Sequence, residues 1–462
     1  MTMICVPSVI RRSSNGSRHR SQITIAMLLP ILLTAAAIQA SPRGPSTAEA
    51  VMTQTVDAEH ERSIGLLQKL VDQNSGTLNI PGVTAIGVAM RRELEPLGFT
   101  VTWKPMSAVK RAGHLIAVHR GRPGTKRLLL IGHLDTVFEP DSPFQRFQRR
   151  GNEAEGPGAG DNKGGTVVMV AALRAMKAAG TLEGANIEIV LTGDEEDVGD
   201  PVATARADLI AAGKRADVAL DFEGLSVQDG RDMGSIARRS SNSWTLTSTG
   251  RTGHSSGIFQ PGVGDGAIFE MTRILARFRM ELPEPNLTFN TGLIAGGATV
   301  SFDDGGVRAT ASGKSNIIPA TATARGDFRT LTEDQTRRVR AKMERIVAEH
   351  APGANSRIRF EEGYPPMPPT AGNATLLAAL NRVNVDLGLP TMAPLDPLKR
   401  GAGDISFVAK DVDGLVGLGP SSRGDHAPGE TVDLQSMRRQ AARAAILMSR
   451  LSRQPIGSPS SD

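Results

Sequence analysis

Residues 128–135 read Leu-Leu-Leu-Ile-Gly-His-Leu-Asp, a short apolar run that leads directly into a histidine and an aspartate. A run of this length and composition is typical of a strand buried on both faces of a parallel sheet. Similar runs follow at 187–191 and 217–220, and the Ala-, Val- and Met-rich stretch 166–179 has helical character. Strands that alternate with helices predict an α/β fold with a mostly parallel sheet.

The pattern changes near residue 235, where alternating and charged segments replace the continuous apolar runs. Strands are expected around 243–248, 287–294 and 321–328, and helices at 266–278 and 333–350. We therefore expect a smaller α+β domain inserted into the first domain. The expected domains are a first catalytic part at 41–234, an insertion at 235–350, a second catalytic part at 351–452 and a disordered tail at 453–462. The first catalytic part is expected to begin with a linker at 41–55, followed by helices at 57–72 and 84–94.

The N-terminal 40 residues have the pattern of a secretory signal peptide. A basic stretch ends at Arg20, an apolar run spans 23–38, and a plausible cleavage site precedes Ser41. A retained membrane anchor is the alternative, because the basic stretch is unusually long. Either way, we expect an exported protein, periplasmic or secreted. The only cysteine, Cys5, lies inside this segment, so the mature chain has no disulfide.

The basic balance of the chain comes from this same segment. The formal net charge is +5, and removing Arg11, Arg12, Arg18 and Arg20 with residues 1–40 leaves +1. Aromatic residues make up only 3% of the chain, too few to favour a stacking platform for bases. Composition therefore argues against a nucleic-acid partner.

Two motifs at expected strand ends can offer metal ligands. His133 follows the first strand, and Asp135 is placed to hold the other ring nitrogen of that histidine. Alone, this pair also fits a structural histidine. Residues 156–165 contain five glycines around Asp161, and glycine lets the backbone aim a side chain closely at a ligand. A phosphate-binding loop is excluded by its missing G-x-x-x-x-G-K-[ST] pattern.

Two further motifs supply acids and a second histidine. Asp194, Glu195, Glu196 and Asp197 follow the strand at 187–191, and adjacent carboxylates near an interior need cations. A solvated acidic turn is the alternative for this run. The list of candidates is completed by Glu223, after the strand at 217–220, and His426, in a Gly- and Pro-rich loop. Nitrogen and carboxylate ligands without thiolates predict two Zn²⁺, with Mn²⁺ or Co²⁺ possible.

In combination and order, these motifs resemble the dizinc metallopeptidases that include glutamate carboxypeptidase, peptidase T, succinyl-diaminopimelate desuccinylase and aminoacylase. The resemblance covers roughly residues 60–452. It implies a zinc-hydrolase catalytic domain with an inserted lid or dimerisation domain, and hence a homodimer. The implied roles are His133 and Glu223 on one zinc, Glu196 and His426 on the other, Asp161 as the bridge, Asp135 as the partner of His133, and Glu195 as general base.

The resemblance also implies substrate contacts. His254, in Gly-His-Ser-Ser at 253–256, would help to bind the oxyanion, often from the partner subunit. Asn316 and Arg329 would hold a substrate carboxylate, although a structural role in the insertion is an alternative for each. Gly403, in the segment Gly-Ala-Gly-Asp at 401–404, stands where the family has threonine.

Two departures bear on function. Asn162 follows the bridging aspartate where many relatives have an acid, and Tyr364 stands where glutamate-specific carboxypeptidases place an arginine. The expected activity is cleavage of an amide next to a free carboxylate, in small peptides or N-acyl amino acids, most like a glutamate carboxypeptidase. A deacylase, an aminopeptidase or a non-catalytic peptide-binding protein is the alternative.

Overall fold

The computed structural model describes residues 45–303 and 305–458. The predicted signal peptide at 1–40 lies outside these residues. Within the described ranges, no helix combines the length and apolar character needed to cross a bilayer.

The larger sheet carries the fold of the catalytic part. Its strands in spatial order are β1 (Thr100–Pro105), β2 (Gly113–His119), β6 (Asn186–Thr192), β3 (Arg127–His133), β7 (Val218–Asp221) and β16 (Gly414–Val416). The pairs β6–β3, β3–β7 and β7–β16 are parallel, whereas β1–β2 and β2–β6 are antiparallel. The expected α/β fold with a mostly parallel sheet is confirmed, and the antiparallel strands lie at one edge.

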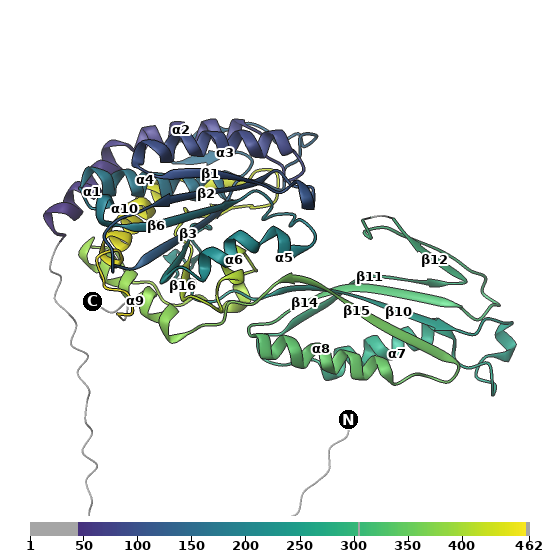
Figure 1. Ribbon diagram of the computed structural model, residues 1–462. Coiled ribbons are helices and arrows are strands. Elements are labelled where there is room, and N and C mark those ends of the chain that lie inside the picture. Colours follow the sequence, from purple (N-terminus) through teal and green to yellow (C-terminus); the bar gives the residue numbers. More distant parts are fainter. Residues whose placement is uncertain (1–44, 304, 459–462) are drawn as a thin grey trace, which may run out of the picture. The chain divides into compact units, whose positions relative to one another are not determined.

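Alternate residues of β3 enter two different cores. Leu128 and Leu130 belong to one hydrophobic cluster, and Leu129 and Ile131 belong to another. The helices of the first cluster are α1 (Thr47–Ala58), α2 (His60–Asp72), α3 (Ile80–Leu94), α4 (Lys163–Ala178), α9 (Ala371–Asp386) and α10 (Leu434–Leu451). The second cluster contains α6 (Ala207–Gly213) and the short helix η6 (Asp404–Phe407), with α5 (Val202–Ala205) beside them. Figure 1 shows α2 and α3 on one side of the sheet and α5 and α6 on the other. Both faces are covered, which explains why the strands read as continuous apolar runs.

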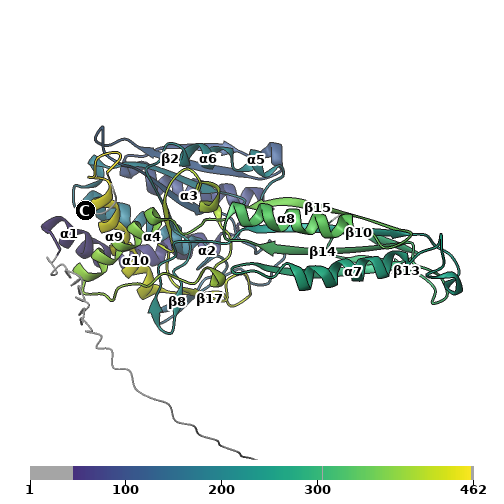
Figure 2. The same ribbon diagram turned by 90° about the horizontal axis from the view of Figure 1, so that it is seen from below.

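The inserted sheet is antiparallel and has one covered face. Its strands in spatial order are β11 (Thr288–Gly297), β14 (Thr321–Arg329), β10 (Ser241–Gly250) and β15 (Ala354–Tyr364). The helices α7 (Gly266–Glu281) and α8 (Glu333–Ala348) pack on it through a separate core around Trp244 and Phe328. Figure 2 shows these two helices running along the strands. A hairpin of β12 (Thr299–Phe302) and β13 (Ala309–Ser312) extends between β11 and β14.

A small sheet joins two loops that are far apart in sequence. Its order is β17 (Ser422–Arg423), β18 (Thr431–Asp433), β5 (Glu153–Glu155) and β4 (Gln148–Arg150). The pairing of β18 with β5 brings the loop of His426 beside the loop of Asp161. A two-stranded hairpin is formed by β8 (Val227–Gln228) and β9 (Arg231–Asp232).

Three predicted boundaries need correction. The expected linker at 41–55 contains most of α1, because Met52 and Val56 bury an apolar stripe and Ser46 and Glu49 form a capping box. The expected end of the insertion at 350 leaves out β15, which pairs with β10 along its length.

The third correction concerns the tail at 453–462. Its first residues follow the catalytic part, with Pro455 bridging to Thr125 and Gln454 accepting a hydrogen bond from the backbone N–H of Lys126. Residues 459–462 lie outside the described residues.

Candidate metal centre and active site

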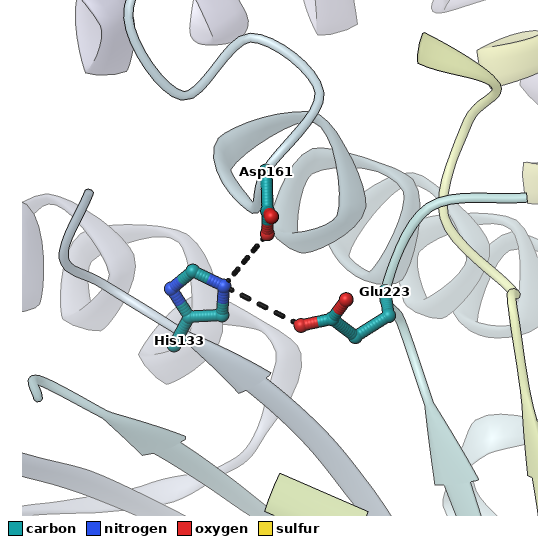
Figure 3. Close-up of side chains that lie close together, drawn as sticks. All are labelled: His133, Asp161 and Glu223. Carbon is teal, nitrogen blue, oxygen red and sulfur yellow. Dashed lines mark hydrogen bonds and ion pairs between the residues drawn. The ribbon is translucent and has the colours of Figure 1, made fainter. Parts of the chain in front are cut away.

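His133 ends β3 and meets two acids from neighbouring segments. Its Nε2 lies 2.9 Å from Oδ1 of Asp161 and 3.5 Å from Oε1 of Glu223. Asp161 precedes α4, and Glu223 comes just after β7, the strand parallel to β3. Figure 3 shows both carboxylates pointing at the same ring nitrogen. These three side chains form the first group able to hold a metal ion.

A second group shares Asp161 with the first. Nε2 of His426 lies 3.2 Å from Oδ2 of Asp161 and 3.2 Å from Oε2 of Glu196. His426 has a left-handed backbone with φ of 66°, which is uncommon outside glycine and aims its ring toward the acids. Oδ1 of Asp161 thus faces the first group, and Oδ2 of the same carboxylate faces the second. The structure brings together all five predicted ligand residues in two groups that share one carboxylate.

Asp135 connects His133 to the acidic loop. Its Oδ1 is 3.3 Å from Nδ1 of His133, and its backbone carbonyl is 3.1 Å from the same nitrogen. Its carboxylate also accepts hydrogen bonds from the backbone N–H groups of Glu195 and Glu196 and from the hydroxyl of Thr77. Asp135 therefore orients the histidine ring and holds the loop of the two glutamates in place.

Glu195 belongs to neither ligand group but lines the same cleft. Burial raises its pKa well above the usual range, and the nearby carboxylates of Glu223, Asp404 and Glu196 raise it further. A glutamate with this environment and no ligand role has the properties of a general acid–base group.

The donor set fits a pair of divalent cations. Oε1 of Glu196 is buried and has no hydrogen-bond partner among the described residues. Burial raises the pKa of Glu196 to about 7, and hydrogen bonds to Asp161 and Glu196 raise the pKa of His426 to about 11. Carboxylates this close together repel one another, and bound cations would relieve that repulsion. Histidine and carboxylate donors suit Zn²⁺, Mn²⁺ or Co²⁺.

A cleft of about 480 Å³ opens over these acids. Its lining also includes four cationic side chains, those of Arg238, Arg329, Lys399 and Arg400. Arg400 lies 3.5 Å from Glu223 and donates to the carbonyl of Gly224, so the cationic lining begins beside the first ligand group. Of the predicted substrate contacts, Arg329 lines the cleft. Gly403 does not line the cleft. It lies so close to Arg238 that a Cβ at this position would collide with the guanidinium of Arg238.

His254 and Asn316 lie elsewhere. Both are exposed, and neither lines the cleft. They are neighbours, since the backbone N–H of Ser255 donates to the carbonyl of Asn316 and His254 forms a bridge with Ile317. Within one chain, the structure does not bring this pair to the metal ligands.

Sequence reasoning assigned no role to Glu430, which shapes the centre. Its carboxylate accepts hydrogen bonds from the backbone N–H groups of Gly158, Gly160 and Asp161, at 3.1, 2.7 and 2.9 Å. It thereby fixes the loop that carries the shared carboxylate. Arg238 and Arg400 were also missed. An arginine pair at 238–239 where the chain enters the insertion was the available signal for the first.

Comparisons with known proteins identify the family of the chain. The model of the peptidase family M20/M25/M40 matches residues 129–450. Carboxypeptidase G2 of Pseudomonas sp. (strain RS-16) is 30% identical over 319 residues, covering 68% of this chain and 71% of the relative. A succinyl-diaminopimelate desuccinylase of Novosphingobium aromaticivorans is 30% identical over 300 residues, covering 62% and 73%.

A solved structure supports the fold. The aminopeptidase PepT of Bacillus cereus superposes with a TM-score of 0.67 at 17% identity, covering 85% of this chain and 99% of that one. The resemblance drawn from the motifs, and the prediction of a metal-dependent hydrolase, are confirmed by the family match and the curated relatives. The chain belongs to the peptidase family M20/M25/M40.

Proposed function

We propose that this hydrolase is an exported dizinc enzyme that cleaves an amide bond next to a free carboxylate, most like a glutamate carboxypeptidase. The observation that carries the proposal is the pairing of two ligand groups through Asp161 with an unliganded Glu195 beside them. The cationic side chains in the cleft lining support an anionic substrate, and the relatives named carboxypeptidase and desuccinylase support an amide bond as the target.

His133 and Glu223 would hold one cation, Glu196 and His426 the other, and Asp161 would bridge them. Two bound divalent cations would supply Lewis-acid polarisation of the scissile carbonyl and would lower the pKa of the attacking water. Glu195 takes the proton of that water and delivers it to the leaving amine, which is the role of a general acid–base group. Asp135 fixes the position of the Glu195 loop relative to the His133 ring, because its carboxylate contacts the backbone N–H of Glu195 and Nδ1 of His133.

Arg329 binds the substrate carboxylate in this proposal. Its guanidinium faces the cleft and is held by Oδ2 of Asp327 at 3.3 Å, and its planar fork suits a carboxylate. Tyr364 also lines the cleft.

The direct test is a product screen with residues 41–462, purified with Zn²⁺. The panel contains glycyl-L-glutamate, glycyl-L-leucine, N-acetyl-L-glutamate, N-acetyl-L-methionine and p-aminobenzoyl-L-glutamate, each with and without a chelator. We expect chelator-sensitive release of the C-terminal or acylated amino acid. Cleavage of the two glycyl dipeptides and of none of the N-acylated substrates, which lack a free α-amino group, would point to an aminopeptidase instead. No release from any substrate with metal bound would favour a binding protein.

A homodimer through the insertion is part of the proposal. The exposed position of His254 and Asn316, outside the cleft of their own chain, supports delivery to the cleft of a second copy. Sedimentation should give twice the chain mass, and His254→Ala should lower kcat while leaving that mass unchanged. A fully active monomer would contradict this part.

Export is the last part of the proposal, and the basic and apolar pattern of residues 1–40 supports it. Expression of the full chain in a Gram-negative host, followed by fractionation and N-terminal sequencing, should find a periplasmic protein beginning near Ser41. A cytoplasmic protein that retains residues 1–40 would contradict it.

A further inference from the structure

Tyr364, the only tyrosine of the chain, connects the inserted sheet to the acidic loop. It is the last residue of β15, where the chain leaves that sheet. Its hydroxyl donates to the backbone carbonyl of Glu195 at 2.7 Å and accepts from Nη2 of Arg206 at 2.9 Å. The phenol therefore touches the main chain of the proposed general base.

Arg206 makes this contact rigid. Its side chain is completely buried, with Nε donating to Oδ1 of Asp404 at 2.7 Å and Nη1 to Oδ1 of Asp194 at 2.6 Å. Asp404 in turn accepts from the hydroxyl of Thr192 at 2.5 Å. A buried arginine whose three guanidinium nitrogens all donate hydrogen bonds has little freedom to move. Nη2 of Arg206 is therefore a fixed donor to the phenol oxygen.

The aromatic ring of Tyr364 is held as well. Its centroid lies 4.9 Å from the ring of Phe407, and the guanidinium of Arg206 lies 5.5 Å from the centre of that second ring. Such contacts fix both the direction and the depth of the phenol.

Tyr364 also separates two cavities. It lines the cleft of the metal ligands and a second cavity of about 290 Å³. The second cavity is bounded by Glu333 and Arg340 of α8 and by Ile210 of α6. Because α8 packs on the inserted sheet and α6 on the larger one, the ring stands where the two meet.

We infer that Tyr364 is a positioning residue for Glu195, coupling the inserted sheet to the general base through its hydroxyl and Arg206. Movement of the end of β15 would shift the carbonyl of Glu195, and with it the carboxylate. The inference rests on the proposed function, since it takes Glu195 as the general base.

Tyr364→Phe tests the inference by removing one oxygen and keeping the ring. On the fastest substrate of the panel we expect kcat to fall about ten- to a hundredfold, as for other orienting hydrogen bonds. KM and the zinc content should stay nearly unchanged. Val347→Ala, in the core of the insertion, is the control for general loosening and should leave kcat nearly unchanged.

Other outcomes would overturn the inference. An unchanged kcat would do so, and so would a raised KM with normal kcat, which would make the phenol a substrate contact. Loss of zinc would show a structural role. The Glu195→Gln variant distinguishes failure of the inference from failure of the proposed function. If Glu195→Gln is inactive and Tyr364→Phe is fully active, only the inference is rejected. If Glu195→Gln is active, the assignment of Glu195 as general base is rejected.

A measurement without substrate is available because the tyrosine is unique. In zinc-loaded protein labelled with ¹³Cζ-tyrosine, equal H₂O and D₂O should give two resolved lines, since a hydroxyl held between Arg206 and Glu195 exchanges slowly. A single averaged line would show that the hydroxyl is not held, and the inference would fail.

Discussion

At the residue scale, neighbouring glutamates have different surroundings. Glu196 lies 3.2 Å from His426 and belongs to the ligand group that also contains Asp161, whereas Glu195 stays outside both ligand groups. Their backbone N–H groups share one acceptor, Asp135, so the separation is built into the loop. This arrangement fits the proposed roles, in which Glu196 binds a cation and Glu195 moves a proton.

Glu195→Gln tests this division directly. We expect kcat to fall about a hundred- to ten-thousandfold, because an amide cannot take the proton of the attacking water. Bound zinc, measured by elemental analysis, should equal that of the unchanged protein. Glu188→Gln, in the strand β6 that leads into this loop and paired with Arg215, is the matched control and should keep full activity. Full activity of Glu195→Gln would exclude it as general base.

At the element scale, the approach of α4 to β7 decides where the shared carboxylate lies. Gly165, in the first turn of α4, has no room for a side chain, since a Cβ there would come within 1.9 Å of the carbonyl oxygen of Phe222. Phe222 precedes Glu223, and Asp161 precedes α4. The close packing therefore sets the spacing between two ligands on different elements.

Gly165→Ala should move the helix away from the strand. We expect a loss of about 1–3 kcal/mol in the free energy of unfolding, as for other overpacked positions, together with weaker zinc binding. Urea unfolding and zinc titration measure the two effects. Gly65→Ala in α2 is the control: nothing lies within 4 Å of its Cβ, and helix propensity predicts a gain of up to about 1 kcal/mol. Equal stability of both variants would contradict the packing argument.

The contact between β9 and α10 makes the free energy of unfolding depend on pH. Asp232 of β9 binds Nη1 of Arg443 at 2.6 Å and Nε of Arg439 at 3.1 Å, both on α10. Burial opposes ionisation, but the hydrogen bonds and charges of these arginines outweigh it, and the pKa of Asp232 lies below its ordinary value. A carboxyl with a lowered pKa in the folded state stabilises the fold above its unfolded pKa, near 4, and loses this effect as pH falls.

Asp232→Asn should therefore destabilise the protein by about 2 kcal/mol at pH 7, since it leaves Arg443 buried without its partner charge. The difference should shrink as the pH falls below about 4. Urea unfolding at several pH values measures it. Asp334→Asn, in an exposed pair with Arg337, is the control and should change stability little at any pH. A difference for Asp232→Asn that is constant with pH would contradict the assignment.

At the scale of the whole molecule, the metal centre joins segments from both ends of the catalytic part. His133 and His426 are held together by the pairing of β18 with β5 and by one carboxylate, Asp161. Without cations, the carboxylates there repel one another. The folded chain should therefore gain stability from metal, because cations bind the native state and not the unfolded chain.

Removal of metal should lower Tm, and zinc should restore it. At zinc about a hundred times its Kd, mass action predicts a gain of about 2.7 kcal/mol for each site. Asp161→Asn should abolish the zinc-dependent shift, since both groups share this residue. Asp411→Asn, an exposed acid away from the ligands, should retain it. A Tm that does not respond to chelation would contradict the metal centre.

The sequence by itself determined the buried strands of the larger sheet and the candidate ligand residues, because both are local patterns. Apolar runs mark buried strands, and each candidate ligand follows such a run or lies in a glycine-rich loop, as His133 and Asp161 do. Only the tertiary structure decided what surrounds them. Glu430 contacts the backbone of Gly160 from 270 residues away, and Tyr364 reaches Glu195 from 169 residues away. No local pattern records such contacts, because they depend on which loops the pairing of strands brings side by side.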